Sequence, residues 1–429
     1  MSSFRESLKS RQLERLRHLL ATVRESNPFY RNHLSGTPAP ESESVSLENF
    51  GEVIPVTTKD LISADQIANP PFGSNLSFPL RNYVRFHQTS GSTGKPIRWL
   101  DTVANWQSML ESWKMVFNAS GVRQGDRVFF AFSFGPFLGF WTAFEAAQQL
   151  DLLSIPGGGM STSARLKAIF DTSANVLCCT PTYAIHLGQS AANTDLDIKN
   201  SPVRHIIVAG EPGGSLPTVR SRIEALWPGA VVHDHHGMTE VGPVTFPCPT
   251  RPNTLRVYEE NFLAEIVNPD SLMPVRPGET GELLLTTLTR TGSPLIRYRT
   301  GDLVCAVAEE TDPSDYLGLD GGIIGRADDM VIIRGVNIFP SAVDALIRRF
   351  PQVEEYQVTV DESRPMTEIS ILAEFLPDEY RDSNSEKSAI QSLEAELREH
   401  FNLRIPVTRA KTGSLPRFEM KSRRWIRVR

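Results

Sequence analysis

Short β-rich runs alternate with helical stretches between about Asn82 and Pro294, and this alternation constrains the fold more than any other feature. The β-rich runs are VFFAF, NVLCC, HIIVAG and AVVHD, which begin at Val128, Asn175, His205 and Ala230, with LLLTTL following near Leu283. The helical stretches between them include TVANWQSMLESWKMVF, STSARLKAIF and PTVRSRIEAL. Strands joined through helices pair in parallel. The sequence therefore predicts an α/β fold with parallel-rich sheets.

The pattern changes after Gly325. VIIRG, YQVTV and ISILAEFL are typical of strands, whereas SAVDALIRRF and residues 383–401 are typical of helices. About 100 residues remain, which is the size of a small α+β domain. We therefore divide the chain into residues 1–325, a large N-terminal α/β body of several subdomains, and residues 326–429, a small α+β domain. The boundary is placed at Gly325–Asp329.

One uncharged run, VFFAFSFGPFLGFWTAF from Val128 to Phe144, has nearly the length of a membrane helix. Gly135 and Pro136 interrupt it, and a proline inside a helix removes a backbone hydrogen bond. We therefore interpret the run as a buried strand at Val128–Phe134, a turn, and the start of a helix, in preference to a membrane segment.

The net charge limits the kinds of binding partner that the chain can have, and the number of cysteines indicates the cellular compartment. The 44 Lys and Arg against 50 Asp and Glu give a net charge of −6, whereas binders of nucleic acid or anionic membranes need a basic excess. Four cysteines in 429 residues indicate a reducing compartment without a disulfide framework. Met1–Leu20 lacks the apolar stretch of a signal peptide. We expect a cytoplasmic protein that binds neither nucleic acid nor membrane.

The motif TSGSTGKP, Thr89 to Pro96, carries the clearest chemical signal. Glycines and hydroxyl residues at this density form a loop whose backbone N–H groups can surround an anion, and Lys95 adds a positive charge. A Walker A loop would need a glycine where Thr89 stands, five positions before Gly94. The motif therefore indicates an anion-binding loop outside the P-loop class.

Four further motifs carry charged or hydroxyl side chains. HDHHGMTE ends at Glu240, whose carboxylate is the hard oxygen ligand that Mg²⁺ prefers, and GEP lies upstream at Gly210–Pro212. YRTGD places Asp302 after a glycine turn, where carboxylates often bind ribose hydroxyls. GRADDMVIIRGVNIFP spans the domain boundary, and SLPRFEMKSRR places Lys421 near the C-terminus.

Taken in order, these motifs resemble those of the adenylate-forming superfamily of acyl-CoA synthetases, nonribosomal-peptide adenylation domains and luciferases. The chain is most similar to the phenylacetate–CoA ligase family, through TSGSTGKP, IPGGG, TPTYA, GEPGGS, GMTEVGP, SPLIRYRTGDL, GRADDMVIIRGVNIFP and SLPRFEMK. The likeness runs from about Arg15 to the C-terminus. It implies that ATP and a carboxylic acid give an acyl-adenylate and pyrophosphate, after which the CoA thiol displaces AMP. It also implies a mobile C-terminal lid that carries a catalytic lysine.

The resemblance assigns roles to individual residues. The β- and γ-phosphates are expected to bind Ser90, Gly91, Ser92, Thr93, Gly94 and Lys95. The adenine is expected near Gly210, Glu211, Pro212, Asp234, His235 and His236. Asp302 is expected to bind the ribose hydroxyls, and Arg326 the ribose or the phosphates. The catalytic group is expected to comprise Thr239 at the α-phosphate, Glu240 as the Mg²⁺ ligand, and Lys421 between the attacking carboxylate and the α-phosphate. Asp328 is the expected hinge. A lysine on a lid can withdraw after the first half-reaction, so one site can serve two reactions in turn.

Two positions depart from the family pattern. His236 stands where an aromatic residue is usual, and its imidazole can still stack on adenine with a smaller area. Met420 stands where a glycine usually precedes the catalytic lysine, which would stiffen that loop. Neither change removes a charge that the chemistry needs. We expect them to affect rate and nucleotide affinity rather than reaction type.

A zinc site is the less favoured alternative reading of four side chains, His233, His235, His236 and Cys248. HxHH with a distant cysteine lacks the tight spacing of zinc modules. The downstream positions are Arg256 and Asn261, which are not ordinary ligands. We expect buried or pocket histidines instead.

The acyl pocket is expected between FSFGPFLGF and the strand that ends at Gly210. Its candidate lining residues are Phe132, Phe134, Phe137 and Ala209. Phenylalanines here are equally consistent with ordinary core packing. If they line a pocket, an aryl or other apolar acid fits better than acetate or a polar amino acid.

Two alternative functions stay open. The acyl or AMP group could pass to a carrier protein, an amine or a cofactor, as in the relatives that adenylylate a deazaflavin coenzyme. The chain could also be a degenerate nucleotide-binding relative, although Lys95, Glu240, Asp302, Arg326 and Lys421 are all present. Dimers are common in the family that the chain resembles, so a homodimer is a further expectation.

Overall fold

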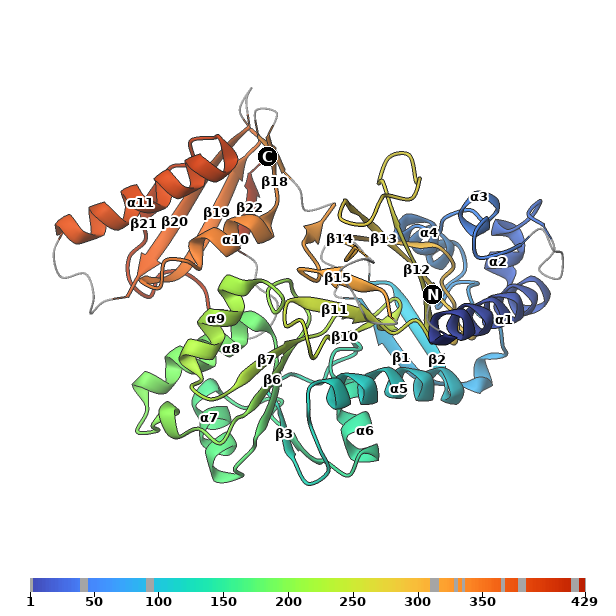
Figure 1. Cartoon of the computed structure of the whole chain (residues 1–429), viewed down its shortest axis with the longest axis horizontal. Coiled ribbons are helices and arrows are strands. Elements are labelled where there is room, and N and C mark those ends of the chain that lie inside the picture. Colours follow the sequence, from blue (N-terminus) through green and yellow to red (C-terminus); the bar gives the residue numbers. More distant parts are fainter. Residues whose placement is uncertain are drawn as a thin grey trace.

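The structure is a computed structural model of the chain. It describes residues 3–38, 45–89, 96–308, 316–327, 331–333, 336–363, 367–376, 383–417 and 424–428. The elements coloured orange-red to red in Figure 1, at the C-terminal end of the chain, form a group apart from the larger body. The two bodies are described in turn.

A five-stranded parallel sheet with the order β4-β3-β5-β6-β7 lies in the larger body. Its strands are β3 (Arg127–Phe130), β4 (Leu153–Pro156), β5 (Val176–Cys179), β6 (His205–Val208) and β7 (Val231–Asp234). The helices against it are α5 (Val103–Ala119), α6 (Trp141–Gln149), α7 (Thr162–Asp171), α8 (Pro181–Ser190) and α9 (Pro217–Leu226). This arrangement confirms the predicted α/β fold.

Each face of this sheet has a hydrophobic core of its own. Successive side chains of a strand point to opposite faces. Val128 and Phe130 therefore pack with residues of α5 and α6, whereas Phe129 between them packs with residues of α7, α8 and α9. A strand buried on both faces needs apolar residues at every position, which explains the continuous runs in the sequence.

The apolar run from Val128 to Phe144 contains the predicted strand, turn and helix, with a shorter strand. β3 ends at Phe130 rather than Phe134, because the N–H of Phe132 turns back to the Phe130 carbonyl oxygen at 2.8 Å. Residues 131–140 form a loop, and α6 begins at Trp141. Among the helices of the described residues, none has the length and hydropathy to span a bilayer.

The other sheets of the larger body are antiparallel. The largest has the order β12-β13-β14-β16, formed by β12 (Phe262–Val267), β13 (Thr280–Thr287), β14 (Tyr298–Cys305) and β16 (Gly325–Arg326). The smaller ones pair β10 (Thr245–Pro247) and β15 (Gly318–Asp320) with β11 (Thr254–Val257), β8 (Gly237–Met238) with β9 (Gly242–Pro243), and β1 (Tyr83–Gln88) with β2 (Arg98–Thr102). β13 confirms the strand predicted at LLLTTL.

In the described part of the chain, four α-helices precede β1, namely α1 (Ser3–Ser26), α2 (Pro28–His33), α3 (Phe50–Val53) and α4 (Lys59–Ala68). The described residues also include the short 3₁₀ helices η1 (Leu80–Asn82), η2 (Ala191–Asn193) and η3 (Ile198–Asn200). α1 buries Leu16, Leu20 and Val23 in a core that it shares with the chain around Ile296. The N-terminal segment therefore packs against residues that lead into β14.

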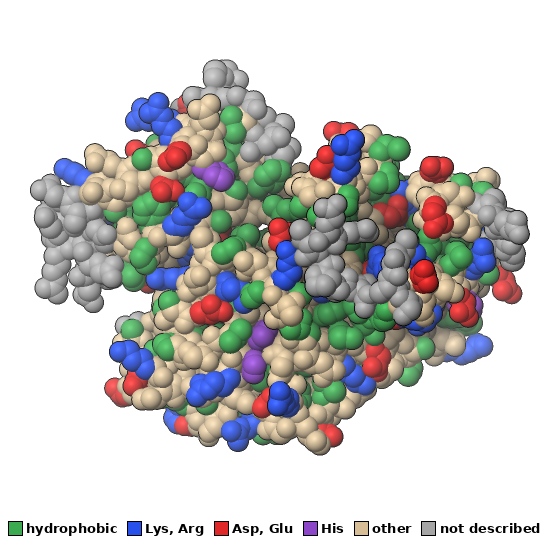
Figure 2. Space-filling view, in the orientation of Figure 1, with side chains coloured by type: hydrophobic (Ala, Val, Ile, Leu, Met, Phe, Trp, Pro, Cys, Tyr) green, Lys and Arg blue, Asp and Glu red, His purple; other side chains and the backbone are tan. Residues whose placement is uncertain are grey.

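The smaller body has its own core, which contains buried residues from Val331 to Val407. Its sheet has the order β21-β20-β19-β22, formed by β19 (Val353–Asp361), β20 (Glu368–Phe375), β21 (Val407–Arg409) and β22 (Trp425–Val428). The hairpin β17 (Val331–Ile333) and β18 (Val336–Ile338) and the helices α10 (Pro340–Ile347) and α11 (Ser383–Phe401) complete it. α11 confirms the predicted helix. Figure 2 shows hollows between the two bodies at the margins of their contact.

The predicted domain boundary falls close to the change of core. β16 pairs with β14 of the larger body, whereas Val331 belongs to the smaller core. Residues 328–330 between them, including the predicted hinge Asp328, lie outside the described residues. We keep the division into residues 1–325 and 326–429 as a proposal.

Candidate active site

Several of the predicted site segments follow strands of the parallel sheet. The aromatic loop 131–140 follows β3, GEP follows β6, and His235 and His236 follow β7. The carboxyl ends of parallel strands meet at one edge of a sheet, where α/β proteins bind their ligands. The fold therefore brings these segments to the same edge.

The anion-binding loop is closed at its base by Thr89. The N–H of Thr89 donates to the Ile97 carbonyl oxygen at 2.9 Å, and Oγ1 of Thr89 accepts from the N–H of Ile97 at 3.0 Å. The N–H of Gln88 donates to the Pro136 carbonyl oxygen at 2.6 Å, so the base of the loop lies beside the aromatic loop. The predicted phosphate ligands Ser90, Gly91, Ser92, Thr93, Gly94 and Lys95 lie outside the described residues.

The GEP segment is tied to the first turn of α8. Oε1 of Glu211 accepts from the N–H of Thr182 at 2.8 Å, and a carboxylate is favourable at a helix N-terminus. Gly210 has φ +97°, a conformation that residues with a Cβ rarely adopt. Gly210 and Pro212 are exposed. Glu211 therefore fixes the loop, while its neighbours face outward.

Asp234 and His235 have their contacts inside the larger body. Oδ2 of Asp234 accepts from the Ser215 hydroxyl at 2.6 Å, and burial raises the pKa of this carboxyl. Nδ1 of His235 lies 2.7 Å from the Thr245 carbonyl oxygen and therefore carries the proton. Burial lowers the pKa of His235 to about 3, so the ring is neutral at pH 7. Both side chains support the turn that leads to His236.

Asp302 gathers two other predicted nucleotide-binding residues. Nε2 of His236 lies 2.9 Å from Oδ2 of Asp302, and Nη1 of Arg326 lies 3.1 Å from Oδ1. Asp302 and Arg326 are opposite each other in the antiparallel register of β14 and β16. Asp302 is 4% exposed. A carboxylate has about four acceptor positions, so capacity for ribose hydroxyls remains beside the two protein donors.

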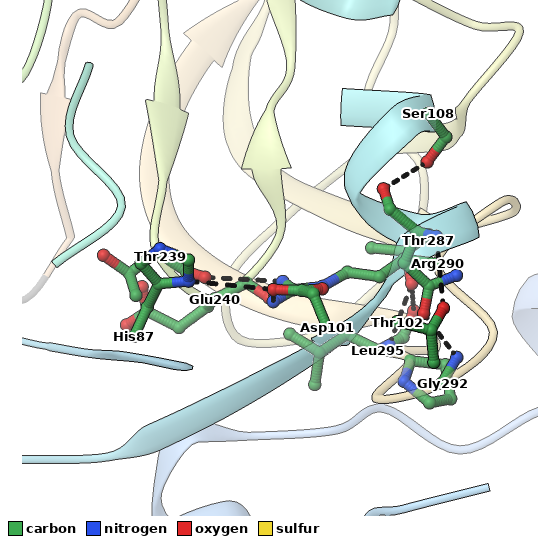
Figure 3. A network of polar contacts seen from close by, with 12 residues as sticks. His87, Asp101, Thr102, Ser108, Thr239, Glu240, Thr287, Arg290, Gly292 and Leu295 are labelled. Atoms are coloured by element: carbon green, nitrogen blue, oxygen red, sulfur yellow. Dashed lines mark hydrogen bonds and ion pairs between the residues drawn. The ribbon is translucent and has the colours of Figure 1, made fainter. Parts of the chain in front are cut away.

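Thr239 and Glu240 form the turn between β8 and β9. Nη1 of Arg290 contacts the carbonyl oxygens of both residues, at 3.4 Å for Thr239. Figure 3 shows the side chain of Arg290 reaching Asp101, with dashed contacts that run on to this turn. Glu240 is 9% exposed, and its carboxylate has no hydrogen-bond or ion-pair partner among the residues that the structure describes.

The Glu240 carboxylate fits the predicted role as an Mg²⁺ ligand. Mg²⁺ in nucleotide sites is usually held by one or two carboxylates, with waters and phosphate oxygens as the other ligands. Within the described ranges, no three His, Cys, Asp or Glu side chains are grouped so that they could hold a metal. With Glu240 as one ligand, such a metal would have room for water and phosphate oxygens.

The four side chains of the zinc alternative have separate partners. Nε2 of His233 lies 3.1 Å from Nδ1 of His205, and Sγ of Cys248 lies 3.5 Å from Nη2 of Arg256. His235 and His236 contact Thr245 and Asp302 as described above. The structure does not group these four side chains around a common point.

Phe132, Phe134 and Phe137 lie in one aromatic cluster. The ring centroids of Phe132 and Phe137 are 5.5 Å apart and edge-to-face, and Phe134 lies 4.7 Å from Trp141. The three phenylalanines are half-buried, and Phe132, Phe134 and Ala209 pack against the same core. The cluster thus joins the core at one end and reaches the surface of the larger body at the other.

The predicted catalytic Lys421 and the neighbouring Met420 lie outside the described residues, but Arg424 is described. Nε of Arg424 forms an ion pair with Oε1 of Glu355 at 2.5 Å within the smaller body. Nη1 of Arg424 donates to Oγ1 of Thr182 at 3.3 Å, across to the larger body. This contact links the segment that follows Lys421 to the first turn of α8, whose Thr182 N–H donates to Glu211.

Asp101 and Arg290 lie outside the sequence motifs that predicted the site. Arg290 is 2% exposed and Asp101 is fully buried. One signal was available in the sequence RWLDT, because an aspartate that directly follows Trp99 and Leu100 marks a buried charge that needs a partner. The partner itself, 189 positions away in sequence, had no such mark.

Comparisons with known proteins agree with this geometry. A family model described as AMP-binding enzyme matches residues 82–289, and one described as AMP-binding enzyme C-terminal domain matches residues 335–429. A phenylacetate-coenzyme A ligase of Thermus thermophilus is 31% identical over 432 residues, which cover 97% of this chain and 95% of that protein.

Two solved structures of one ligase differ in their likeness to this chain. 2-Hydroxyisobutyryl-CoA ligase in the postadenylation state, in complex with 2-HIB-AMP, has a TM-score of 0.92 at 28% identity over 98% of this chain and 90% of its own. The same ligase in the thioesterification state, in complex with 2-HIB-AMP and CoA, has a TM-score of 0.73 at 28% identity over 100% and 90%. The chain belongs to the phenylacetate–CoA ligase family of adenylate-forming, AMP-binding enzymes.

Proposed function

We propose that this chain is an AMP-forming acid–CoA ligase whose acid is aromatic or otherwise hydrophobic. ATP and the acid give an acyl-adenylate and pyrophosphate, and the CoA thiol then displaces AMP to give the thioester. The observation that carries the proposal is the arrangement around Asp302 and Glu240, in a chain 31% identical to a phenylacetate-coenzyme A ligase over nearly its whole length.

In the first half-reaction, two anions must approach each other. The acid carboxylate attacks the α-phosphorus and pyrophosphate leaves, so positive charge is needed where they meet. Lys421 is proposed to supply it from the smaller body, and Lys95 with the backbone of the anion-binding loop is proposed to hold the leaving phosphates. A metal at Glu240 would neutralise phosphate charge when bound.

Other residues hold the nucleotide in place. Asp302 is proposed to accept hydrogen bonds from the ribose hydroxyls, with His236 and Arg326 fixing its carboxylate. Thr239 is proposed to donate to the α-phosphate. Glu211 and its neighbours are proposed to border the adenine, in a loop held by α8.

The aromatic loop supports an apolar acid. The rings of Phe132 and Phe137 contact each other edge-to-face, and Pro136, next to Phe137 in the chain, accepts a backbone hydrogen bond from Gln88 at the base of the anion-binding loop. A pocket lined in this way favours an aryl ring over a charged or small acid.

A panel of carboxylic acids tests the proposal. AMP and pyrophosphate release is measured for aryl, branched aliphatic and short polar acids, with and without CoA. We expect acid-dependent ATP–pyrophosphate exchange without CoA, and AMP release that becomes catalytic only with CoA. Catalytic turnover with a carrier protein or an amine, but not with CoA, would replace the proposed acceptor. No exchange with any acid would reject the activity.

The proposal includes three properties that need their own measurements. These are an Mg²⁺ requirement, tested with EDTA and back-titration, a homodimer, tested by light scattering, and a cytoplasmic location, tested by fractionation.

A further inference from the structure

Arg290 is a buried arginine with two kinds of partner. Its Nε and Nη2 form a two-pronged ion pair with Asp101, at 2.6 Å to Oδ1 and 2.9 Å to Oδ2. Its third nitrogen, Nη1, faces the carbonyl oxygens of Thr239 and Glu240 (Figure 3). The guanidinium is planar, so fixing two nitrogens on Asp101 also fixes the direction of the third.

Asp101 is held in turn by the strand that leads to the anion-binding loop. It lies on β2, opposite β1, and its Oδ2 is 3.8 Å from Nδ1 of His87. The His87 ring is stacked on Trp106, with centroids 5.2 Å apart and planes 3° from parallel. Burial would raise the pKa of Asp101, but Arg290 and His87 outweigh it and lower the pKa, so Asp101 stays charged.

The arrangement spans two parts of the site that are far apart in sequence. Asp101 is bonded to Arg290 behind the Thr239–Glu240 turn, and it faces His87 two positions before Thr89, which closes the anion-binding loop. A carbonyl that is held by a charged donor cannot rotate without losing that bond. The direction of the Glu240 side chain depends on the backbone of the same residue.

We propose that Arg290, held in place by Asp101, is a positioning residue that fixes the backbone of Thr239 and Glu240 for a metal–nucleotide complex. It touches neither the substrate nor the metal in this role. The inference rests on the proposed function for the identity of the ligand at Glu240, and on the described contacts for the position of the turn.

The test compares Arg290→Lys with Arg297→Lys. Arg297 is also buried, forms an ion pair with Glu265 at 3.0 Å, and donates to the carbonyl oxygens of Gly51 at 2.6 Å and Ile54 at 2.7 Å. It is therefore a matched arginine away from the Thr239–Glu240 turn. Lysine keeps the charge in both variants and removes the planar fork.

Two measurements are made on the full chain. Mn²⁺ is titrated in the presence of a non-hydrolysable ATP analogue and followed by EPR, and the Mg²⁺ dependence of ATP–pyrophosphate exchange is recorded. We expect Arg290→Lys to weaken nucleotide-dependent Mn²⁺ binding about 10- to 100-fold, the usual cost of losing a group that orients a metal ligand. Arg297→Lys is expected to stay within about twofold of the unmodified chain, because it does not touch the turn.

Equal changes in both lysine variants, or unchanged Mn²⁺ binding in Arg290→Lys, would overturn the inference. If Arg290→Lys does not fold, Asp101→Asn is measured in its place, because it keeps the arginine and weakens the ion pair that holds it. Unchanged Mn²⁺ binding in Asp101→Asn would also overturn the inference. An unmodified chain that binds Mn²⁺ with the nucleotide but exchanges no pyrophosphate would reject the proposed activity and leave the inference intact.

Discussion

Asp302 is a single carboxylate with two protein donors and a proposed substrate. His236 and Arg326 occupy one oxygen each, from the loop after β7 and from β16. Since Oδ2 accepts, Nε2 of His236 carries the proton, and Nδ1 is buried without a hydrogen-bond partner in the described part of the chain. Besides the stacking on adenine that the sequence predicts, the imidazole of His236 donates a hydrogen bond that orients the Asp302 carboxylate.

We expect His236→Ala to raise KM for ATP about tenfold, because a hydrogen bond to a charged group contributes about 1.5–3 kcal/mol and Asp302 loses one of its two donors. KM for the acid should change less. His236→Gln restores an N–H donor and should recover part of the loss. His233→Gln, whose partner is His205, serves as the control. An ATP KM that is unchanged in His236→Ala would contradict this account of Asp302.

His235 gives a pH prediction whose sign follows from its burial. Burial lowers its pKa to about 3 from the ordinary value of 6.5. Between these two values the unfolded chain binds a proton that the folded chain does not. The stabilisation from the neutral ring is therefore complete above about pH 6.5 and is lost as the pH falls, by up to about 1.4 kcal/mol per pH unit.

Denaturant unfolding at several pH values between 7 and 4.5 measures this dependence. His235→Asn keeps a donor for the Thr245 carbonyl oxygen and cannot titrate in this range. The variant should start less stable, because it loses the ring contact with Trp113 at 4.4 Å. Its free energy of unfolding should then fall less steeply with acid than that of the unmodified chain. Parallel curves for the two proteins would show that His235 does not contribute to the dependence.

At the scale of elements, the sequence predicted the helices and strands that neighbouring residues alone identify. Strands buried on both faces are continuous apolar runs, and α11 has an apolar face at Leu393 and Leu397, so these elements were found. The end of β3 was misplaced by four residues, because a turn from Phe132 to Phe130 leaves the composition apolar. The Asp101–Arg290 pair depends on tertiary contact alone. The resemblance of the motifs to a known family identified the candidate site residues. Their contacts with one another could be seen only in the folded structure.

The loop after β3 allows its phenylalanines to be separated into packing and binding groups. Phe134 packs on Trp141 and on Phe144, at 4.7 and 5.3 Å, whereas the recorded ring contact of Phe137 is with Phe132. We expect Phe137→Ala to raise KM for an aryl acid by about tenfold or more, which is the scale for losing apolar contact with a substrate, and to leave KM for ATP unchanged.

Phe134→Ala is the comparison for this prediction. It should lower the thermal midpoint more than Phe137→Ala does, since it empties space beside two aromatic rings. If Phe137→Ala lowers the midpoint as much and leaves the acid KM alone, the side chain belongs to the core.

For the whole molecule, the placement of the smaller body is informative. The TM-score is 0.92 against a relative in the postadenylation state and 0.73 against the same relative in the thioesterification state, at the same identity of 28%. The difference therefore reflects arrangement rather than sequence. The two bodies of this chain are therefore arranged more like those of that relative in the postadenylation state than like those of the thioesterification state. Arg424 to Thr182 and Arg222 to Pro351 are two contacts between the bodies, at 3.3 and 3.1 Å.

If the smaller body must move before CoA reacts, the Arg424–Thr182 contact has to break. Thr182→Val removes the hydroxyl and keeps the shape of the side chain, while the Arg424–Glu355 pair within the smaller body remains. One hydrogen bond contributes about 0.5–1.5 kcal/mol, so ATP–pyrophosphate exchange should slow by about two- to tenfold. Thioester formation from a preformed acyl-adenylate should be unchanged or faster. The smaller body must move before this step, and in Thr182→Val the hydrogen bond from Arg424 no longer opposes that movement.

Thr218→Val on α9 is the matched control, because the Thr218 hydroxyl has no hydrogen-bond partner among the described residues. Single-turnover measurements of each half-reaction separate the two effects, which a steady-state rate would combine. Equal slowing of both half-reactions in Thr182→Val would mean that the hydroxyl supports α8 and the Glu211 loop rather than the position of the smaller body. An increase in the ratio of the second rate to the first is the result that only a contact between the two bodies produces, since a local defect in the nucleotide site has no means of favouring thioester formation.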